Sequence, residues 1–228
     1  MTTHEYVVVG SGPTGAQAAQ TLVEAGKEVR LLDVGMRDPH GYEGKVPDRG
    51  FLEIRKQDPA QHRFFLGEQY EGVPLGGIRA GSNLSPPRQY VTAETERWLP
   101  AISEAFKPVE SLAYGGLGSA WGLGCFTMSD SELALMGLRP EEIRASYQVI
   151  ADRIGISGSD ADGLRAFGHG LSRLLPALEI DEASELLLAR YRAHREKLNK
   201  KGITFGRTML ALLSQDFKGR RASRYQDM

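Results

Sequence analysis

The hydrophobic pattern near the N-terminus predicts a strand, a tight turn, a helix and a second strand. Residues 6–9 (YVVV) form a continuous apolar run, as expected of a strand buried on both faces of a parallel sheet. Four apolar residues then recur on one face of a predicted helix: Ala16, Ala19, Leu22 and Val23. This helix ends at Gly26, and residues 29–33 form the second strand. The pattern predicts a βαβ unit over residues 5–35, within an α/β fold.

The turn after the first strand carries the motif G-x-G-x-x-G, in the order Gly10, Ser11, Gly12, Pro13, Thr14 and Gly15. The first glycine permits a sharp turn, the second lets a pyrophosphate approach the backbone, and the third lets the helix pack closely on the strand. Pro13 fits the first helical position, where an N–H has no intrahelical acceptor. The free N–H groups and the helix dipole favour an anion. The motif predicts dinucleotide binding, with a ligand-free glycine turn as the alternative.

Asp33 lies at the end of the second predicted strand, 18 residues after Gly15. A carboxylate at this position can accept hydrogen bonds from the 2′- and 3′-hydroxyl groups of a ribose. It would repel a 2′-phosphate, which argues against NADP. Val34 and Gly35 follow directly, so we include both residues in the predicted cofactor-binding segment.

A second glycine-rich segment covers residues 112–126, with the sequence LAYGGLGSAWGLGCF. Five of the ten residues from 115 to 124 are glycine. Regular structure disfavours this density, because each glycine costs about 1 kcal/mol inside a helix. Such a backbone can pass close to a ligand or close to another packed segment, and both interpretations stay open. Trp121 could pack against a planar ring or belong to the core.

Turn-forming residues predict loops at 36–50 and 72–90, with a short helix between them that begins at Asp58-Pro59 and carries Phe64 and Phe65. After residue 128 the pattern is mostly helical. Ser129 and Glu132 fit a capping box. A helix should begin at Pro140, bury Ile143, Tyr147, Ile150 and Ile154, and end at Gly155.

The longest helix should cover 181–201, bury Leu187, Tyr191 and Leu198, and end before Gly202. Residues 203–205 and 209–213 should form short strands.

Composition excludes several classes of function. The 28 basic and 29 acidic residues are mixed along the 228-residue chain, without a basic stripe for nucleic acid. No apolar run is long enough to span a bilayer, and the first strand leaves no room for a signal peptide. The single Cys125 suits a reducing cytoplasm. The five histidines have no metal-ligand spacing, and no motif identifies a catalytic nucleophile, so we expect no metal site and assign no catalytic residue.

The two glycine-rich segments together resemble the glucose–methanol–choline (GMC) family of flavin-dependent oxidoreductases. The resemblance rests on YVVVGSGPTGAQAAQTLVEAGKEVRLLDVG and on YGGLGSAWG, and it covers residues 5–36 and 110–158. It implies that Gly10, Gly12 and Gly15 bind the FAD pyrophosphate and that Asp33, where the family more often has glutamate, binds the adenosine ribose. It further implies that the second segment approaches the pyrophosphate and isoalloxazine through Gly115, Gly116, Gly118 and Ser119, with Trp121 and Gly122 in the same motif.

The resemblance implies a Rossmann-like FAD-binding domain at 1–128 and a mostly helical region at 129–228 that leads into a substrate domain. The implied reaction is hydride transfer from a CH–OH group of an alcohol or sugar-like substrate to FAD. The family's catalytic histidine lies in the C-terminal part of a chain about twice this length. We therefore expect an incomplete fold and no turnover by this chain alone. An NAD-dependent dehydrogenase and an inactive dinucleotide-binding module are the alternatives.

Overall fold

A computed structural model describes residues 5–39, 51–64, 66–70, 84, 86–100, 105–106 and 108–223. The chain forms two compact units. The first contains Met1–Asp48 and Ile54–Trp121, and the second contains Arg49–Glu53 and Gly122–Met228. The division between Trp121 and Gly122 lies a few residues before the boundary predicted at residue 128.

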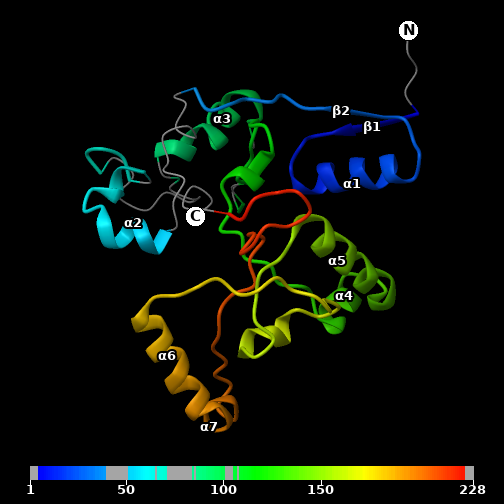
Figure 1. Cartoon of the computed structure of the whole chain (residues 1–228). Helices are drawn as coiled ribbons and strands as arrows, with labels where there is room; N and C mark the ends of the chain where they lie inside the picture. Colours follow the sequence, from blue (N-terminus) through cyan, green and yellow to red (C-terminus); the bar gives the residue numbers. More distant parts are fainter. Residues whose placement is uncertain are drawn as a thin grey trace. The chain divides into compact units, whose positions relative to one another are not determined.

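The first unit is built on the predicted βαβ arrangement. Strand β1 (Tyr6–Val9) is followed by helix α1 (Pro13–Glu24) and strand β2 (Val29–Leu32). The two strands are parallel, with Tyr6 opposite Val29 and Val9 opposite Leu32. Figure 1 shows the strands side by side with α1 along them. The α/β character of the N-terminal region is therefore confirmed, and β2 ends one residue earlier than predicted.

Helix α1 packs on one face of this two-stranded sheet. Gly15 makes close packing possible: a Cβ there would lie 2.0 Å from the Gly10 carbonyl oxygen and 3.6 Å from Val8 Cγ1. Val7 and Val9 point to the other face, because side chains alternate along a strand. They are 56% and 81% exposed. The expected burial of β1 on both faces is therefore wrong, since the side chains that point away from α1 are exposed.

The predicted apolar face of α1 is only partly correct. Ala19 and Leu22 are half-buried, whereas Ala16 and Val23 are exposed. Two strands are too narrow to cover the whole apolar stripe of a helix about 10 Å wide.

The chain beyond β2 pairs with the second glycine-rich segment. Met36 forms a parallel β-bridge with Ala113. The Met36 N–H donates to the Leu112 carbonyl over 3.0 Å, and the Tyr114 N–H donates to the Met36 carbonyl over 2.9 Å. This pairing brings two segments that lie more than 70 residues apart in the sequence to the carboxyl end of the sheet.

Short helical segments occupy the middle of the chain: α2 (Phe51–Gln57), η2 (Gln61–Phe64), η3 (Pro86–Thr92), α3 (Thr95–Trp98) and η4 (Gly116–Ser119). The short helix predicted after Asp58-Pro59 is the 3-10 helix η2, which begins at Gln61 and carries Phe64. Asp58 accepts a hydrogen bond from the Ala60 N–H over 2.9 Å at the entry to this helix. Phe65 and most of the predicted loops at 36–50 and 72–90 lie outside the described residues.

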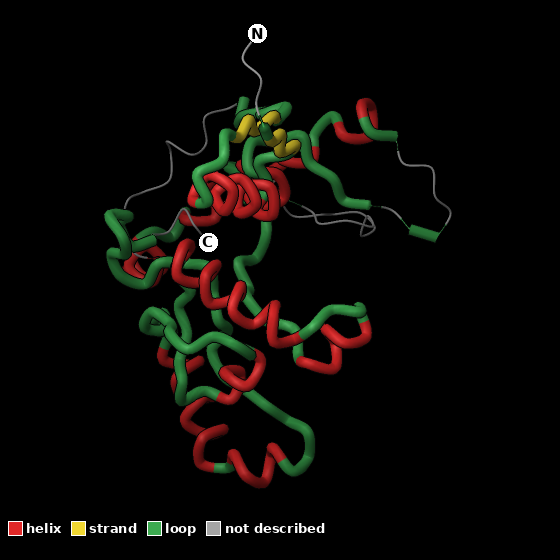
Figure 2. Tube along the Cα trace, turned by 90° about the vertical axis from the view of Figure 1, so that its right-hand side faces the viewer, coloured by secondary structure: helices red, strands yellow, loops and turns green. Residues whose placement is uncertain are grey.

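The second unit is mainly helical, as predicted, with α4 (Asp130–Leu135), α5 (Pro140–Ile154), η5 (Gly163–Phe167), α6 (Glu182–Ala193) and α7 (Arg195–Asn199). Irregular chain, drawn green in Figure 2, follows α5 and η5, whereas α6 and α7 are separated by His194 alone. The capping box of Ser129 and Glu132 is confirmed. Pro140 begins α5, and Gly155 with φ +80° ends it. The four apolar residues predicted for the inner face of α5 are half-buried.

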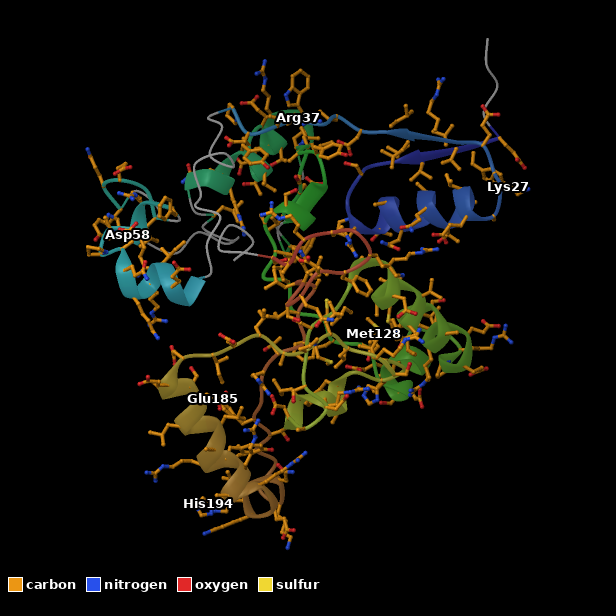
Figure 3. The ribbon with its side chains drawn as sticks, viewed as in Figure 1. Lys27, Arg37, Asp58, Met128, Glu185 and His194 are labelled. Atoms are coloured by element: carbon orange, nitrogen blue, oxygen red, sulfur yellow. The ribbon has the colours of Figure 1, made fainter. Side chains whose placement is uncertain are left out.

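Three details of the second unit differ from the prediction. The helix predicted at 181–201 is interrupted at His194, which lies between α6 and α7 in Figure 3. Leu188 is buried in place of Leu187, which is 58% exposed. The strands predicted at 203–205 and 209–213 are absent from these described residues, of which Leu210 forms isolated bridges with Gly124 and with Ser157. These bridges place Met209 in a core with Ala151, Ile156 and Leu171.

A buried carboxylate joins three parts of the second unit. The side chain of Asp162 is fully buried and accepts hydrogen bonds from Arg192 Nη2 (2.9 Å) and Arg207 Nε (2.8 Å). The backbone N–H of Arg207 donates to the same carboxylate over 3.2 Å. Burial raises the pKa of Asp162, but the hydrogen bonds and charges of the two arginines outweigh it and hold the pKa below the ordinary value.

None of the helices within the described ranges combines the length and the apolar character that crossing a lipid bilayer requires.

Candidate dinucleotide-binding site

The turn between β1 and α1 has the conformation that its glycines were predicted to supply. Gly10 has φ +93°, a region that residues with a Cβ rarely adopt, and its N–H donates to the Leu32 carbonyl over 2.7 Å. Gly12 is the N-cap of α1, and Pro13 is the first helical residue. The backbone therefore leaves β1, turns sharply, and enters the helix within three residues.

The N-terminus of α1 has unused hydrogen-bond donors. The first intrahelical bond runs from the Ala16 N–H to the Gly12 carbonyl over 2.9 Å. The N–H groups of Gly12, Thr14 and Gly15 donate to no other described residue. The first turn also contains no acidic side chain. These donors and the positive end of the helix dipole can together bind an anionic group such as a phosphate.

Asp33 lies directly beside this turn. Its carboxylate accepts hydrogen bonds from the Ser11 N–H (2.5 Å) and the Gly35 N–H (2.6 Å). Desolvation raises the pKa of Asp33, but the hydrogen bonds from Ser11 and Gly35 outweigh it, so the pKa lies below its ordinary value. A carboxylate offers about four lone-pair sites. The exposed Asp33 side chain therefore retains capacity to accept hydrogen bonds from a ribose.

The structure brings the second glycine-rich segment against the first. The Gly115 N–H donates to Ser11 Oγ over 2.9 Å. A Cβ on Gly116 would lie 3.2 Å from Gly12 Cα, and a Cβ on Gly118 would lie 2.7 Å from Pro13 Cγ. Three predicted residues of one segment thus contact three consecutive residues of the other.

These contacts assign a packing role to two of the glycines. The second segment was interpreted as approaching either a ligand or another packed segment. For Gly116 and Gly118 the structure shows another packed segment, which contains Gly12 and Pro13. Ser119 forms a hydrogen bond within the second segment, since its hydroxyl donates to the Tyr114 carbonyl over 2.9 Å. Trp121 is 38% exposed, and a Cβ on Gly122 would enter open space. Their contact with a cofactor stays a prediction, as does that of Val34, which is 68% exposed.

One pair of residues at this site was not found from the sequence. The Arg37 guanidinium lies 5.1 Å from the centre of the Tyr114 ring. Arg37, labelled in Figure 3, follows β2, and Tyr114 directly precedes Gly115. Each residue is adjacent to a predicted segment, but only the pairing of Met36 with Ala113 places them together.

The described residues contain no group of three His, Cys, Asp or Glu side chains arranged to hold a metal ion. Among the described histidines, His62 stacks on Tyr70 at 4.1 Å between ring centres, and His194 lies between α6 and α7. The groups around Gly12 offer N–H donors for an anion and, in Asp33, a hydrogen-bond acceptor.

No protein-family model matches the chain, and no curated protein is significantly similar to it. The resemblance to the GMC family rests on the two glycine-rich segments alone.

Proposed function

We propose that the chain binds FAD and forms the Rossmann-like cofactor-binding part of a GMC-like oxidoreductase that acts on the CH–OH group of an alcohol or sugar. The observation that carries this proposal is the contact between the two segments on which the resemblance rests. Gly115 and Ser11 are separated by 104 positions and share a hydrogen bond of 2.9 Å. Both segments therefore border one site, as joint binding of one extended cofactor requires.

The residues present suit such a cofactor. The N–H groups of Gly12, Thr14 and Gly15, which donate to no other described residue, would hold the pyrophosphate, and no Cβ at Gly12 obstructs the approach. Asp33 would accept hydrogen bonds from the ribose hydroxyls. FAD, when bound, would supply the acceptor for the hydride. The protein would contribute binding and orientation through these groups.

A second candidate, an NAD-dependent dehydrogenase, gains support from one observation. The glycines at 116 and 118 are accounted for by packing against Gly12 and Pro13, so a flavin is not needed to explain them. Asp33 is equally compatible with the adenosine ribose of NAD.

Spectroscopy and titration distinguish these candidates. The absorption spectrum of the purified protein shows whether flavin is bound, and FAD and NAD are then titrated separately. The proposal predicts flavin absorption bands, or saturable quenching of FAD fluorescence, with much weaker binding of NAD. Saturable binding of NAD without binding of FAD would establish the dehydrogenase candidate. Binding of neither would refute a dinucleotide site.

Asp33 allows a sharper test. We expect Asp33→Ala to weaken FAD binding by about 1.5–3 kcal/mol, or roughly ten- to a hundredfold, because a charged acceptor is removed. Asp33→Asn should lose less, since it retains one acceptor oxygen. Glu24→Ala, which removes an exposed carboxylate at the other end of α1, is the matched control. Equal dissociation constants for Asp33→Ala and the wild type would refute the ribose assignment.

A further inference from the structure

We infer that Ser11 is a positioning residue whose hydroxyl group holds the second glycine-rich segment in place beside the dinucleotide turn. This role concerns the protein without ligand. Its consequence for cofactor affinity rests on the proposed function, and the experiment below separates the two.

Ser11 connects three segments of the first unit. Its Oγ accepts the Gly115 N–H over 2.9 Å, while its own N–H donates to the Asp33 carboxylate over 2.5 Å. The Ser11 side chain also contributes to holding the pKa of the Asp33 carboxyl below its ordinary value. Ser11 is therefore hydrogen-bonded to the second glycine-rich segment through its hydroxyl and to Asp33 through its backbone N–H.

The other contacts of the second segment cannot replace this hydrogen bond. Backbone pairing with Met36 ends at the Tyr114 N–H, and the Gly116 N–H is occupied by the Ala113 carbonyl at 2.8 Å. Gly116 and Gly118 touch Gly12 and Pro13 through van der Waals contact alone, which limits approach but fixes no direction. The Gly115 N–H is therefore the donor by which the second segment is oriented on the first.

The residue at position 11 must meet two requirements. Its side chain must be short enough to reach the backbone of Gly115, and it must accept a hydrogen bond. Alanine meets only the first requirement and leaves the partly buried Gly115 N–H without its acceptor. Threonine retains the hydroxyl, so it is the conservative substitution.

Tryptophan fluorescence can report on the second segment without any ligand. The chain has two tryptophans, Trp98 and Trp121. Trp98 is 62% exposed, so Trp98→Phe leaves Trp121 as a single reporter at low structural cost. In this background we expect Ser11→Ala to increase quenching of Trp121 by acrylamide and Ser11→Thr to restore it. Thr21→Ala is the matched control, because the Thr21 hydroxyl bonds within α1, to the Gln17 carbonyl.

Titration with FAD then measures the consequence for binding. We expect Ser11→Ala to weaken binding roughly three- to tenfold, as the loss of one neutral hydrogen bond implies, with recovery in Ser11→Thr. Unchanged Trp121 quenching in Ser11→Ala would overturn the positioning role, whatever the ligand. If wild type binds no dinucleotide but Trp121 responds as expected, the positioning role stands and the proposed function fails.

Amide hydrogen exchange in the wild type covers the case in which Ser11→Ala does not fold. Slow exchange of the Gly115 amide, relative to the exposed amide of Leu117, would support the hydrogen bond to Ser11. Exchange of Gly115 at the rate of an unstructured chain would overturn the inference.

Discussion

Gly118 and Gly122 form a matched pair for testing how the two glycine-rich segments fit together. Both lie in the second segment, and neither has a positive φ, so alanine is compatible with either backbone. A Cβ on Gly118 would lie 2.7 Å from Pro13 Cγ and 2.9 Å from Cδ, whereas a Cβ on Gly122 would meet nothing within 4 Å. The two substitutions therefore differ in the space available for one methyl group.

The expected magnitudes follow from these distances. Ordinary contacts of a Cβ begin at 3.4 Å, so Gly118→Ala must move the segment or the Pro13 ring by about 0.7 Å. Overpacking of this kind costs about 1–3 kcal/mol. Alanine also increases the free energy of unfolding by about 0.4–1 kcal/mol, because it restricts the unfolded chain more than glycine does. We expect Gly118→Ala to destabilise the first unit by about 1–2 kcal/mol and Gly122→Ala to be neutral or slightly stabilising.

Urea unfolding followed by Trp121 fluorescence in the Trp98→Phe background measures both variants. The unfolding midpoint should fall for Gly118→Ala and stay or rise for Gly122→Ala, with the same slope in denaturant. Equal midpoints for the two variants would refute the packing of Gly118 on Pro13. Such a result would favour the other interpretation of Gly118, in which its backbone approaches a ligand.

Three further predictions concern stability and solubility. Asp162→Asn should destabilise the second unit by about 2–4 kcal/mol, because it breaks a buried ion pair whose arginines can partly rehydrate. The folded-state pKa of Asp162 is lowered, so the difference from wild type in urea unfolding should be full above about pH 5 and shrink as the pH falls below about 4 toward the lowered folded-state pKa. Ser129→Ala should cost about 1 kcal/mol in urea unfolding, as the loss of a helix cap does, with Ser146→Ala on the exposed face of α5 as a comparison. Val9→Thr should lower light scattering at high protein concentration and change the unfolding free energy little, because Val9 is 81% exposed; unchanged scattering would show that this sheet face does not cause association.

Local patterns were sufficient to predict the order of strand, turn, helix and strand at the N-terminus. The conformation of Gly10, the close packing of Gly15 and the position of Asp33 at the end of β2 all depend on residues within one short stretch. The helix signals at Ser129, Pro140 and Gly155 were likewise local, because a cap or a terminating glycine acts on the adjacent turn.

The contact between Ser11 and Gly115 could not be predicted in the same way. Both segments were recognised from their glycines, but the hydrophobic pattern does not indicate which residues of two distant loops are in contact. The packing of Gly118 on Pro13 depends on this contact. The sequence left close approach to a ligand and close approach to another segment both open for Gly118, and it could not indicate Pro13 as the partner.

Errors in the second unit have a different origin. A shift of one residue turns a helix by 100°, which is why Leu187 was predicted to be buried in place of Leu188. Residues 209–213 have the apolar character of a strand. Their backbone pairs only at single positions with Gly124 and Ser157, so Met209 and Leu212 enter the core without a continuous ladder.

The hydrogen bond between Ser11 and Gly115 also determines when this site can form. At a synthesis rate of about 5–20 residues per second, the 104 positions that separate the two residues correspond to roughly 5–20 s on the ribosome. Strands β1 and β2 can pair early in this interval, but the turn before α1 lacks its partner until Gly115 has emerged. Closing a loop of this length also costs about 4 kcal/mol of chain entropy. The second glycine-rich segment therefore joins a βαβ unit whose strands and helix are already synthesised, and Val7 and Val9 stay exposed before and after this step.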